Sequence, residues 1–221
     1  MSESLEVMVI EYGAMSPRVR RVLEAFRFSG LSDEHRQREL QYDKDYNDRS
    51  VYVMVLHNDD IGGVARIIGK TRDMDMLPVE YGKIIETSGK TDVPAVLKTD
   101  VPVLIDPSIL PVCEIGGLKI SESLGMRLKC RVLDLVMKTC HAEIHRRKFN
   151  CFFLTSRDSP HMGRLYTDKV FFQEFARIRY GSEVWRALWR WPFTDDFLKD
   201  CFQRKMDRIP ETCYKFPKGV R

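Results

Sequence analysis

The residues best suited to chemistry lie in the segment CEIGGLKI, residues 113–120. This segment carries one carboxylate, Glu114, and an adjacent glycine pair, Gly116-Gly117. A charged group on a buried strand needs either a partner or a task. Adjacent glycines inside a strand indicate a bulge or a close approach by another backbone, and they also leave room for a ligand. The segment therefore predicts a carboxylate beside a stretch of backbone that a bound molecule could reach.

A strand–helix–strand unit is expected to position this segment. The strand predicted over residues 112–120 is followed by the strongest helical pattern of the chain, at about 126–147, and by an apolar strand at 151–155. The apolar residues of the helix recur at the spacing of one helical face: Leu128, Val132, Leu135, Val136, Cys140 and Ile144. Such a β-α-β crossover is expected to be right-handed.

A capped helix and a hairpin precede this unit. A first strand at residues 5–10 leads to a helix that begins at Ser16-Pro17, where serine suits the N-cap and proline the first helical position. Residues 51–56 and 61–68 then form two strands joined by a tight turn at Asn58-Asp59-Asp60.

The remaining segments have weaker patterns. Residues 32–49 are dense in charge and predict no clear element, and residues 70–111, with five prolines, predict an irregular insert with short elements. Further elements are expected as a short helix at 161–168, a strand at 171–178 and an amphipathic C-terminal helix at 193–209. We expect residues 1–221 to form a single α/β domain, a mixed sheet with helices on both faces.

Composition excludes several classes of protein. Hydrophobic residues make up 43% and charged residues 31%, which is typical of a soluble globular protein. The net charge of +4 falls well short of the footprint of a nucleic-acid binder. No apolar run reaches membrane-spanning length, and the N-terminus lacks a basic signal-peptide region. We therefore expect a cytoplasmic protein whose six cysteines are free thiols, with no zinc site.

Two of these patterns resemble the GNAT acyltransferases. One is CEIGGLKI (113–120), a glycine-containing strand that leads into a long helix and an apolar strand. The other is RLYTDKVFFQE (164–174), which is similar to the second-helix signature of that family, a tyrosine followed after a short gap by an aromatic residue that opens a strand. The resemblance implies a mixed, mostly antiparallel, V-splayed sheet and an acyltransferase activity.

Within that superfamily, the N-terminal half resembles the acyl-homoserine lactone synthases and the long-chain N-acyl amino acid synthases. The matching residues are Asp43-x-Asp45-x-x-Asp48, Tyr52, Ala65-Arg66-Ile67-Ile68 and Glu114. Where the group has a Ser-Arg pair after the glutamate, this chain has Gly116-Gly117. The missing arginine counts against lactone recognition more than against acyl transfer.

The resemblance implies roles for these residues. Glu114 is the candidate general base, acting through a water, with an ion pair to Arg66 as the structural alternative. Tyr166 is the candidate general acid, with a core tyrosine as the alternative. Acceptor binding is implied for Asp43, Asp45, Asp48 and Arg66, although a solvated charged loop explains the three aspartates equally well. Donor binding is implied for Gly116, Gly117, Leu118, Lys119, Ile120, Gly125 and Arg127.

The loop before the long helix bears on the acyl donor. Coenzyme A users in this family have a glycine-rich loop there, which holds the pyrophosphate at the helix N-terminus. This chain reads ESLGMR (122–127), in which only the central glycine fits and Glu122 adds negative charge. Arg127, Lys129 and Arg131 follow, and a basic patch of this kind would attract an acidic acyl carrier protein. We expect no permanently bound cofactor and no metal, only an acyl-phosphopantetheine thioester on a carrier protein or on coenzyme A.

Several alternatives remain open. Rival functions are an acyl-homoserine lactone synthase, a coenzyme A-dependent acetyltransferase and a GNAT-fold binding protein without turnover. His141 and His145 have zinc-compatible i, i+4 spacing, but without a third ligand we interpret them as a surface pair. Trp185, Trp189 and Trp191 could wall a pocket but more often mark a core.

Overall fold

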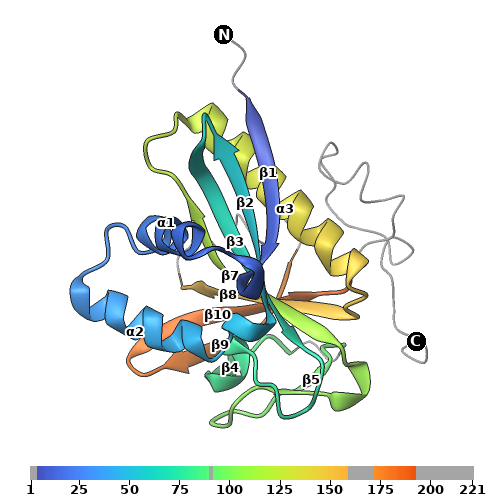
Figure 1. Ribbon diagram of the computed structural model, residues 1–221. Coiled ribbons are helices and arrows are strands. Elements are labelled where there is room, and N and C mark those ends of the chain that lie inside the picture. The colour runs from blue at the N-terminus through green and yellow to red at the C-terminus, as the bar shows by residue number, and fades with distance from the viewer. Residues whose placement is uncertain (1–3, 90–91, 159–171, 193–221) are drawn as a thin grey trace. The chain divides into compact units, whose positions relative to one another are not determined.

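The computed structural model describes residues 4–89, 92–158 and 172–192 (Figure 1). The chain divides into two compact units, one of residues 1–68 and 116–140 and the other of residues 69–115 and 141–221. Each unit is presented by itself, and the expectation of a single domain stays a prediction. Three elements run from one unit into the other, the strands β3 (Asp60–Lys70) and β7 (Val112–Ile120) and the helix α3 (Met126–Arg146).

The sheet of the first unit has the strand order β1-β2-β3-β7. Its other strands are β1 (Leu5–Glu11), β2 (Ser50–His57) and β3 (Asp60–Lys70). β1 and β2 are antiparallel, as are β2 and β3. The β2–β3 turn places Asn58 and Asp59 in the left-handed region, with φ of 51° and 68°, a conformation that asparagine and aspartate tolerate better than most residues. The predicted hairpin is therefore confirmed.

Helices cover both faces of this four-stranded part. α1 (Pro17–Arg27) begins as predicted, with the Ser16 side chain accepting a hydrogen bond from the Val19 N–H at 3.3 Å. Leu23 of α1 packs with Tyr52, Met54 and Val64 in one buried cluster. Gly63, which points to the opposite face from Val64, lies against Val132 and Val136 of α3. α1 and α3 are thus on opposite sides of the strands (Figure 1).

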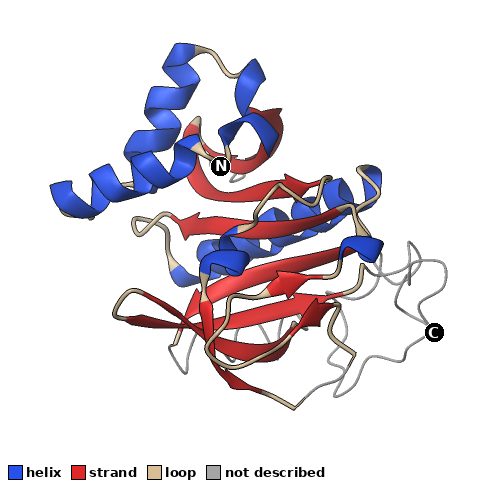
Figure 2. Ribbon diagram, turned by 90° about the horizontal axis from the view of Figure 1, so that it is seen from below, coloured by secondary structure: helices blue, strands red, loops and turns tan. Residues whose placement is uncertain are grey.

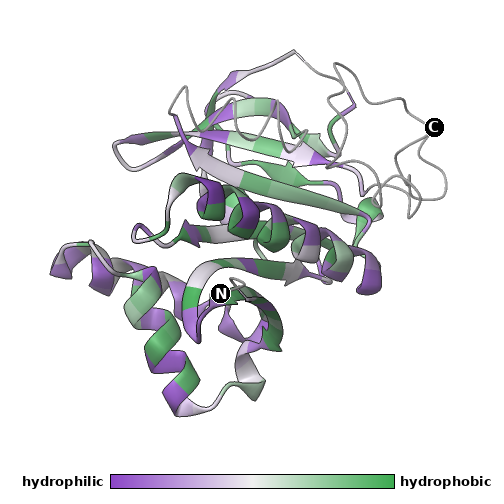
Figure 3. Cartoon of the chain, turned by 90° about the horizontal axis from the view of Figure 1, so that it is seen from above, coloured by the Kyte–Doolittle hydropathy of each residue, from purple (hydrophilic) through white to green (hydrophobic). Residues whose placement is uncertain are grey.

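A second helix in this unit was not predicted. α2 (Asp33–Lys44) follows α1 along the chain (Figure 2), within residues that seemed to lack a pattern. Its residues are mostly charged or polar, so no apolar stripe announces it. Asp33 and Glu34 lie in its first turn and Lys44 in its last, an arrangement that complements the helix dipole. In α1, by contrast, hydrophobic and hydrophilic residues alternate visibly (Figure 3).

The second unit continues the strand order as β7-β8-β10-β9-β4. Its strands are β8 (Cys151–Arg157), β10 (Glu183–Arg190), β9 (Gln173–Tyr180) and β4 (Lys83–Thr87). β7 pairs with β8 in parallel, and the other pairs are antiparallel. The predicted mixed, mostly antiparallel α/β fold is confirmed, including the β7–α3–β8 crossover.

The predicted insert at 70–111 holds short elements, as expected. It contributes β4 to the main sheet and holds a separate two-stranded sheet, β5 (Ala95–Val96) with β6 (Leu104–Ile105). Short 3-10 turns complete the described elements, at Tyr12–Ala14, Asn47–Arg49, Pro78–Tyr81 and Pro107–Ile109. The strand β10 was also missed, because its tryptophans were interpreted as a packing cluster and not as alternating strand residues.

Two of the three clustered tryptophans lie in the core of the second unit. Trp189 and Trp191 are buried and meet edge to face, with ring centroids 5.1 Å apart, which confirms the core interpretation. The helices predicted at 161–168 and 193–209 lie outside the described residues. Within the described ranges, no helix combines the length and the apolar character that crossing a bilayer requires.

Candidate functional site

Glu114 lies buried near the start of β7, with 1% of its surface exposed. Its Oε2 accepts a hydrogen bond from the Val79 N–H at 2.7 Å, and its Oε1 accepts one from the Thr155 hydroxyl at 2.9 Å. Both donors hold the carboxylate in a fixed orientation. Arg66, the structural alternative as a partner, donates to Asp43.

The pairing of β7 with β8 ends directly after Ile115. The parallel register with β8 covers Val112↔Cys151 to Ile115↔Leu154, and Gly116–Ile120 has no place in that ladder. A Cβ built on Gly116 would meet no heavy atom of the described residues within 4 Å. The backbone at Gly116 is therefore approachable from its Cα side, as the glycine pair predicts.

Gly117 differs from its neighbour in two ways. Its φ of +59° lies in the left-handed region, which glycine adopts without strain. A Cβ built there would lie 3.3 Å from Nη2 of Arg27. The close approach predicted at this glycine is made by the guanidinium of a side chain from α1, and not by another backbone.

Arg27 belongs to a buried charge cluster with Asp43 and Arg66, which we call the two-arginine cluster. Asp43 at the end of α2 accepts hydrogen bonds from Nη1 of Arg27 and Nη1 of Arg66, and Arg27 Nη2 adds a longer one at 3.3 Å. The three side chains are only 6%, 6% and 4% exposed. Nη1 of Arg27 also donates to the Tyr52 hydroxyl at 3.2 Å. The cluster thus joins α1, α2, β2 and β3.

Electrostatics keep the Arg27 guanidinium charged. Burial alone lowers the pKa of Arg27, but Tyr52 and Asp43 outweigh it and raise the pKa above its ordinary value. Two buried cations therefore share one buried carboxylate. Sequence reasoning missed Arg27, although its i, i+4 spacing from Leu23 puts both on the buried face of α1.

The predicted acidic pattern is split by the structure. Asp43 is 5% exposed and joins the cluster, whereas Asp45 and Asp48 are exposed. Tyr46, which lies between Asp45 and Asp48 in the sequence, is buried. The guanidinium carbons of Arg49 and Arg66 lie 5.2 and 5.7 Å from its ring centroid. Of the four residues implied in acceptor binding, only Asp43 and Arg66 are brought together.

The remaining donor-site residues follow along β7 and into α3. Lys119 Nζ donates to the Ser29 carbonyl at 2.6 Å and the Ser29 hydroxyl at 2.7 Å, which ties β7 to the end of α1. Burial lowers the pKa of Lys119, and Glu122 acts in the opposite direction. Leu118 and Ile120 are half-buried, and Gly125 and Arg127 at the start of α3 are exposed.

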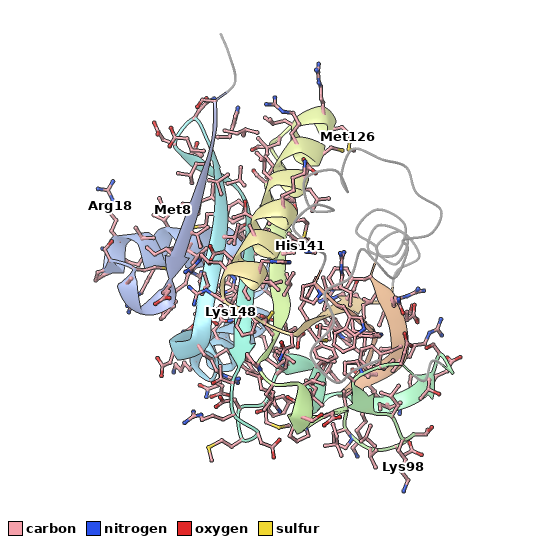
Figure 4. All side chains as sticks on the ribbon, turned by 90° about the vertical axis from the view of Figure 1, so that its right-hand side faces the viewer. Met8, Arg18, Lys98, Met126, His141 and Lys148 are labelled. Atoms are coloured by element: carbon pink, nitrogen blue, oxygen red, sulfur yellow. The ribbon has the colours of Figure 1, made fainter. Side chains whose placement is uncertain are left out.

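Two further candidates need comment. Tyr166, the candidate general acid, lies outside the described residues. The interpretation of His141 as a surface residue is wrong, since it is 1% exposed on α3 (Figure 4) and meets the Phe152 ring at 5.1 Å. Burial, followed by Arg190 and His145, holds the pKa of His141 well below its ordinary value. Among the residues described, no group of His, Cys, Asp and Glu could hold a metal.

No protein-family model matches the sequence, and no curated protein is significantly similar to it. Solved structures do share its fold. FeeM, an N-acyl amino acid synthase from uncultured soil microbes, gives a TM-score of 0.54 at 10% identity over 85% of this chain and 90% of its own. An acyl-CoA N-acyltransferase from Pseudomonas aeruginosa gives 0.52 at 10% identity, and Escherichia coli ElaA gives 0.51 at 16%, each over 85% of this chain and 99% of its own. At these identities the likeness shows the fold alone, and that fold is GNAT-like, as the sequence predicted.

Proposed function

We propose that this protein is an N-acyltransferase, which moves an acyl group from a pantetheine thioester to the amine of an amino acid or a similar small molecule. The observation that carries the proposal is the end of the β7–β8 ladder at Ile115, directly before the glycine pair. Two of the proteins that share the fold are named for N-acyl transfer or N-acyl amino acid synthesis.

In this reaction the amine nitrogen attacks the thioester carbonyl, a C–N bond forms and the C–S bond breaks. The backbone N–H groups of Gly116–Ile120 would pair with the pantetheine arm and donate to the developing oxyanion. The missing side chain at Gly116 would let the thioester come close to the strand.

Two proton transfers complete the balance. Glu114 would take the proton that the amine loses, through a water, and Tyr166 would supply the proton that the thiolate gains. The hydrogen bonds from Val79 and Thr155 support the first role by holding the carboxylate in a fixed orientation.

We further propose acyl carrier protein as the donor. Arg127 and Arg131 are exposed in the first turns of α3, where they would attract an acidic carrier. The exposed Glu122 in the preceding loop would oppose a pyrophosphate. Coenzyme A remains the competing donor, since one protein of the same fold is named an acyl-CoA N-acyltransferase.

The test supplies acyl carrier protein and coenzyme A carrying the same acyl chain, each with a mixture of amines. Thiol release and product mass are followed together. We expect amide formation, faster from the carrier protein, and a fall of about 100-fold or more in Glu114→Gln. The control is Arg72→Gln, at an exposed residue outside the proposed site, and it should leave the rate unchanged. If neither thioester is consumed, the protein is a binding module and the proposal is wrong.

A further inference from the structure

A short 3-10 turn, Pro78–Tyr81, holds one side of the Glu114 carboxylate, and we call it the 78–81 turn. Its first residue is a proline and has no N–H, and the Glu80 N–H donates to the Leu77 carbonyl at 3.0 Å. The Val79 N–H lies between them and donates out of the turn, to Oε2 of Glu114 at 2.7 Å. The turn therefore sets the direction of a donor to a residue 35 positions further along the chain.

A buried carboxylate fixes the start of this turn. Glu80 accepts from the Leu77 N–H at 2.7 Å, so the third residue of the turn reaches back to the residue before it, as in a capping box. The buried Lys70 donates to both oxygens of the same carboxylate and keeps it in place. Without this acceptor the buried Leu77 N–H would lose its partner, and the turn that carries Val79 would loosen.

The strand β9 holds the 78–81 turn from a second direction. The Tyr180 hydroxyl donates to the Pro78 carbonyl at 2.8 Å, although the two residues are 102 apart in the sequence. Directly after the turn, Gly82 packs so closely on β9 that an added Cβ would lie 2.6 Å from Cδ1 of Ile178. Ile178 and Tyr180 are two positions apart on the strand and therefore lie on the same face. The turn is thus tied to a strand of the main sheet.

The two described donors to Glu114 differ in what places them. The Thr155 hydroxyl comes from β8, which pairs directly with β7, so the ladder of the main sheet places it. The Val79 N–H comes from the insert, and only the 78–81 turn places it. A general base must keep its oxygen within hydrogen-bond reach of the proton that it takes. A displacement of about 1 Å can cost about 100-fold in rate.

We propose that Glu80 and Tyr180 are positioning residues for acyl transfer, which act on Glu114 through the 78–81 turn and the Val79 N–H. Neither side chain needs to touch a substrate. Glu80 holds the start of the turn and Tyr180 joins it to β9, so the carboxylate keeps one orientation. The proposal rests on the proposed function for the role of Glu114 as general base. The hold of the turn on the carboxylate can be measured without any turnover.

The kinetic experiment compares Tyr180→Phe with Tyr81→Phe. The first removes the hydroxyl that donates to the turn, and the second removes a hydroxyl from an exposed tyrosine of the same turn. We expect kcat to fall about 3- to 10-fold in Tyr180→Phe with KM unchanged, because the base is displaced while neither substrate loses a contact. Tyr81→Phe should keep the wild-type kcat. An unchanged kcat in Tyr180→Phe, or a change confined to KM, would overturn the role of Tyr180.

Two double variants test Glu80 without leaving Lys70 as an unpaired buried charge. Lys70→Met/Glu80→Gln and Lys70→Met/Glu80→Met both remove the two charges, but only the first keeps a side-chain oxygen that can accept from the Leu77 N–H. We expect kcat of the second to be about tenfold below that of the first, with the same KM. Circular dichroism confirms that both are folded, and Tyr180→Phe decides if they are not. Equal kcat in the two folded variants would contradict the role of Glu80.

Amide hydrogen exchange follows the Val79 N–H in the absence of an acyl donor. We expect the exchange of this amide to be about tenfold or more faster in Tyr180→Phe than in the wild-type protein, because the turn opens more readily. The amides of Val112–Ile115, in the ladder with β8, should keep their rates and serve as the internal control. Unchanged exchange at Val79 would show that Tyr180 does not hold the turn, and the proposal would be wrong.

The kinetic and exchange measurements together separate this proposal from the proposed function. If the wild-type protein consumes no thioester, the transferase proposal is wrong, and exchange at Val79 alone decides whether the turn is held as proposed. If thioester is consumed and exchange at Val79 rises without any fall in kcat, the transferase function stands and the positioning role is wrong.

Discussion

The two units of the chain each bury an ion cluster, and the two clusters differ in their balance. In the second unit, Lys70 Nζ donates to both carboxylate oxygens of Glu80 at 2.7 and 3.0 Å, and the Leu77 N–H donates to Glu80 at 2.7 Å. One cation meets one anion, and both are almost fully buried. In the first unit, two guanidinium groups share Asp43, and a buried Nε of Arg66 lacks a partner among the described residues.

This difference distinguishes a balanced buried ion pair from a buried cluster that has positive charge in excess. The Lys70–Glu80 pair is neutral overall. The Glu80 carboxylate also accepts from the Leu77 N–H and so stabilises the 3-10 turn Pro78–Tyr81 before β4. A neutral, satisfied pair gains nothing from a further ion. The two-arginine cluster holds two positive charges against the single negative charge of Asp43. The comparison predicts that loss of one charge from the Lys70–Glu80 pair lowers stability strongly, because it leaves the other charge buried without a partner.

The largest expected effect is on the balanced pair. Glu80→Gln leaves a buried lysine without its counter-charge, and we expect a loss of about 3–5 kcal/mol in the free energy of unfolding. Urea denaturation measures the loss. The double variant Lys70→Met/Glu80→Met removes both charges and should recover most of it, because an apolar replacement of a buried pair is often close to neutral. A double variant as unstable as the single one would contradict the interpretation of this pair.

A smaller effect is expected at Gly117. Gly117→Ala forces a left-handed φ on alanine and places a Cβ 3.3 Å from Arg27 Nη2, so we expect a loss of about 1–3 kcal/mol. Gly181→Ala is the matched control, with a φ of +57° and no described heavy atom within 4 Å of the added Cβ. Its loss should be about 1 kcal/mol, from the backbone alone. Equal losses in the two variants would show that Arg27 does not need the space beside Gly117.

His141 makes the free energy of unfolding depend on pH between about pH 7 and 5. Burial lowers its pKa in the folded chain, so the unfolded chain binds the proton more readily. Stability is then fully present above the unfolded pKa of about 6.5 and falls as the pH drops below it, by at most about 1.4 kcal/mol per pH unit. His141→Phe should flatten this part of the curve in denaturation series between pH 7 and 5. An unchanged slope would assign the acid response to other groups.

The smallest expected loss of stability concerns the hydrogen bond between Arg27 and Tyr52 beside the two-arginine cluster. Tyr52→Phe removes the hydroxyl that accepts from Arg27 and leaves the packing of the ring in its core cluster. We expect a loss of about 0.5–1.5 kcal/mol in urea denaturation, the usual net value of one hydrogen bond. A loss above about 3 kcal/mol would indicate that the hydroxyl, and not Asp43, is the main partner of Arg27.

Local patterns in the sequence predicted the elements that have them. The Asn58-Asp59 turn, the Ser16-Pro17 cap and the apolar face of α3 all follow from spacings within a few residues. The two-arginine cluster could not be predicted in this way, because Asp43 is 16 residues from Arg27 and 23 from Arg66. Its carboxylate also comes from α2, a helix without an apolar stripe.

Local patterns also failed to predict which side chains are buried. His141 follows Cys140 in a stretch rich in polar residues and yet faces Phe152 from the core, since only the neighbouring strand determines which side of α3 is covered. β4 and β10 were missed for a related reason: their partner strands, and not their own residues, fix their place in the sheet. The glycine pair predicted a close approach by another backbone, whereas the group that lies against Gly117 is the Arg27 guanidinium, which no local pattern indicates.

The central claim is that the backbone of Gly116–Ile120 receives a thioester arm. Amide hydrogen exchange of these residues, with and without an unreactive thioether analogue of acyl-pantetheine, tests it most directly. We expect the exchange of these amides to slow on binding, while the amides of Val112–Ile115, which already lie in the ladder with β8, change little. Unchanged exchange at Gly116–Ile120 in the presence of saturating analogue would contradict the account.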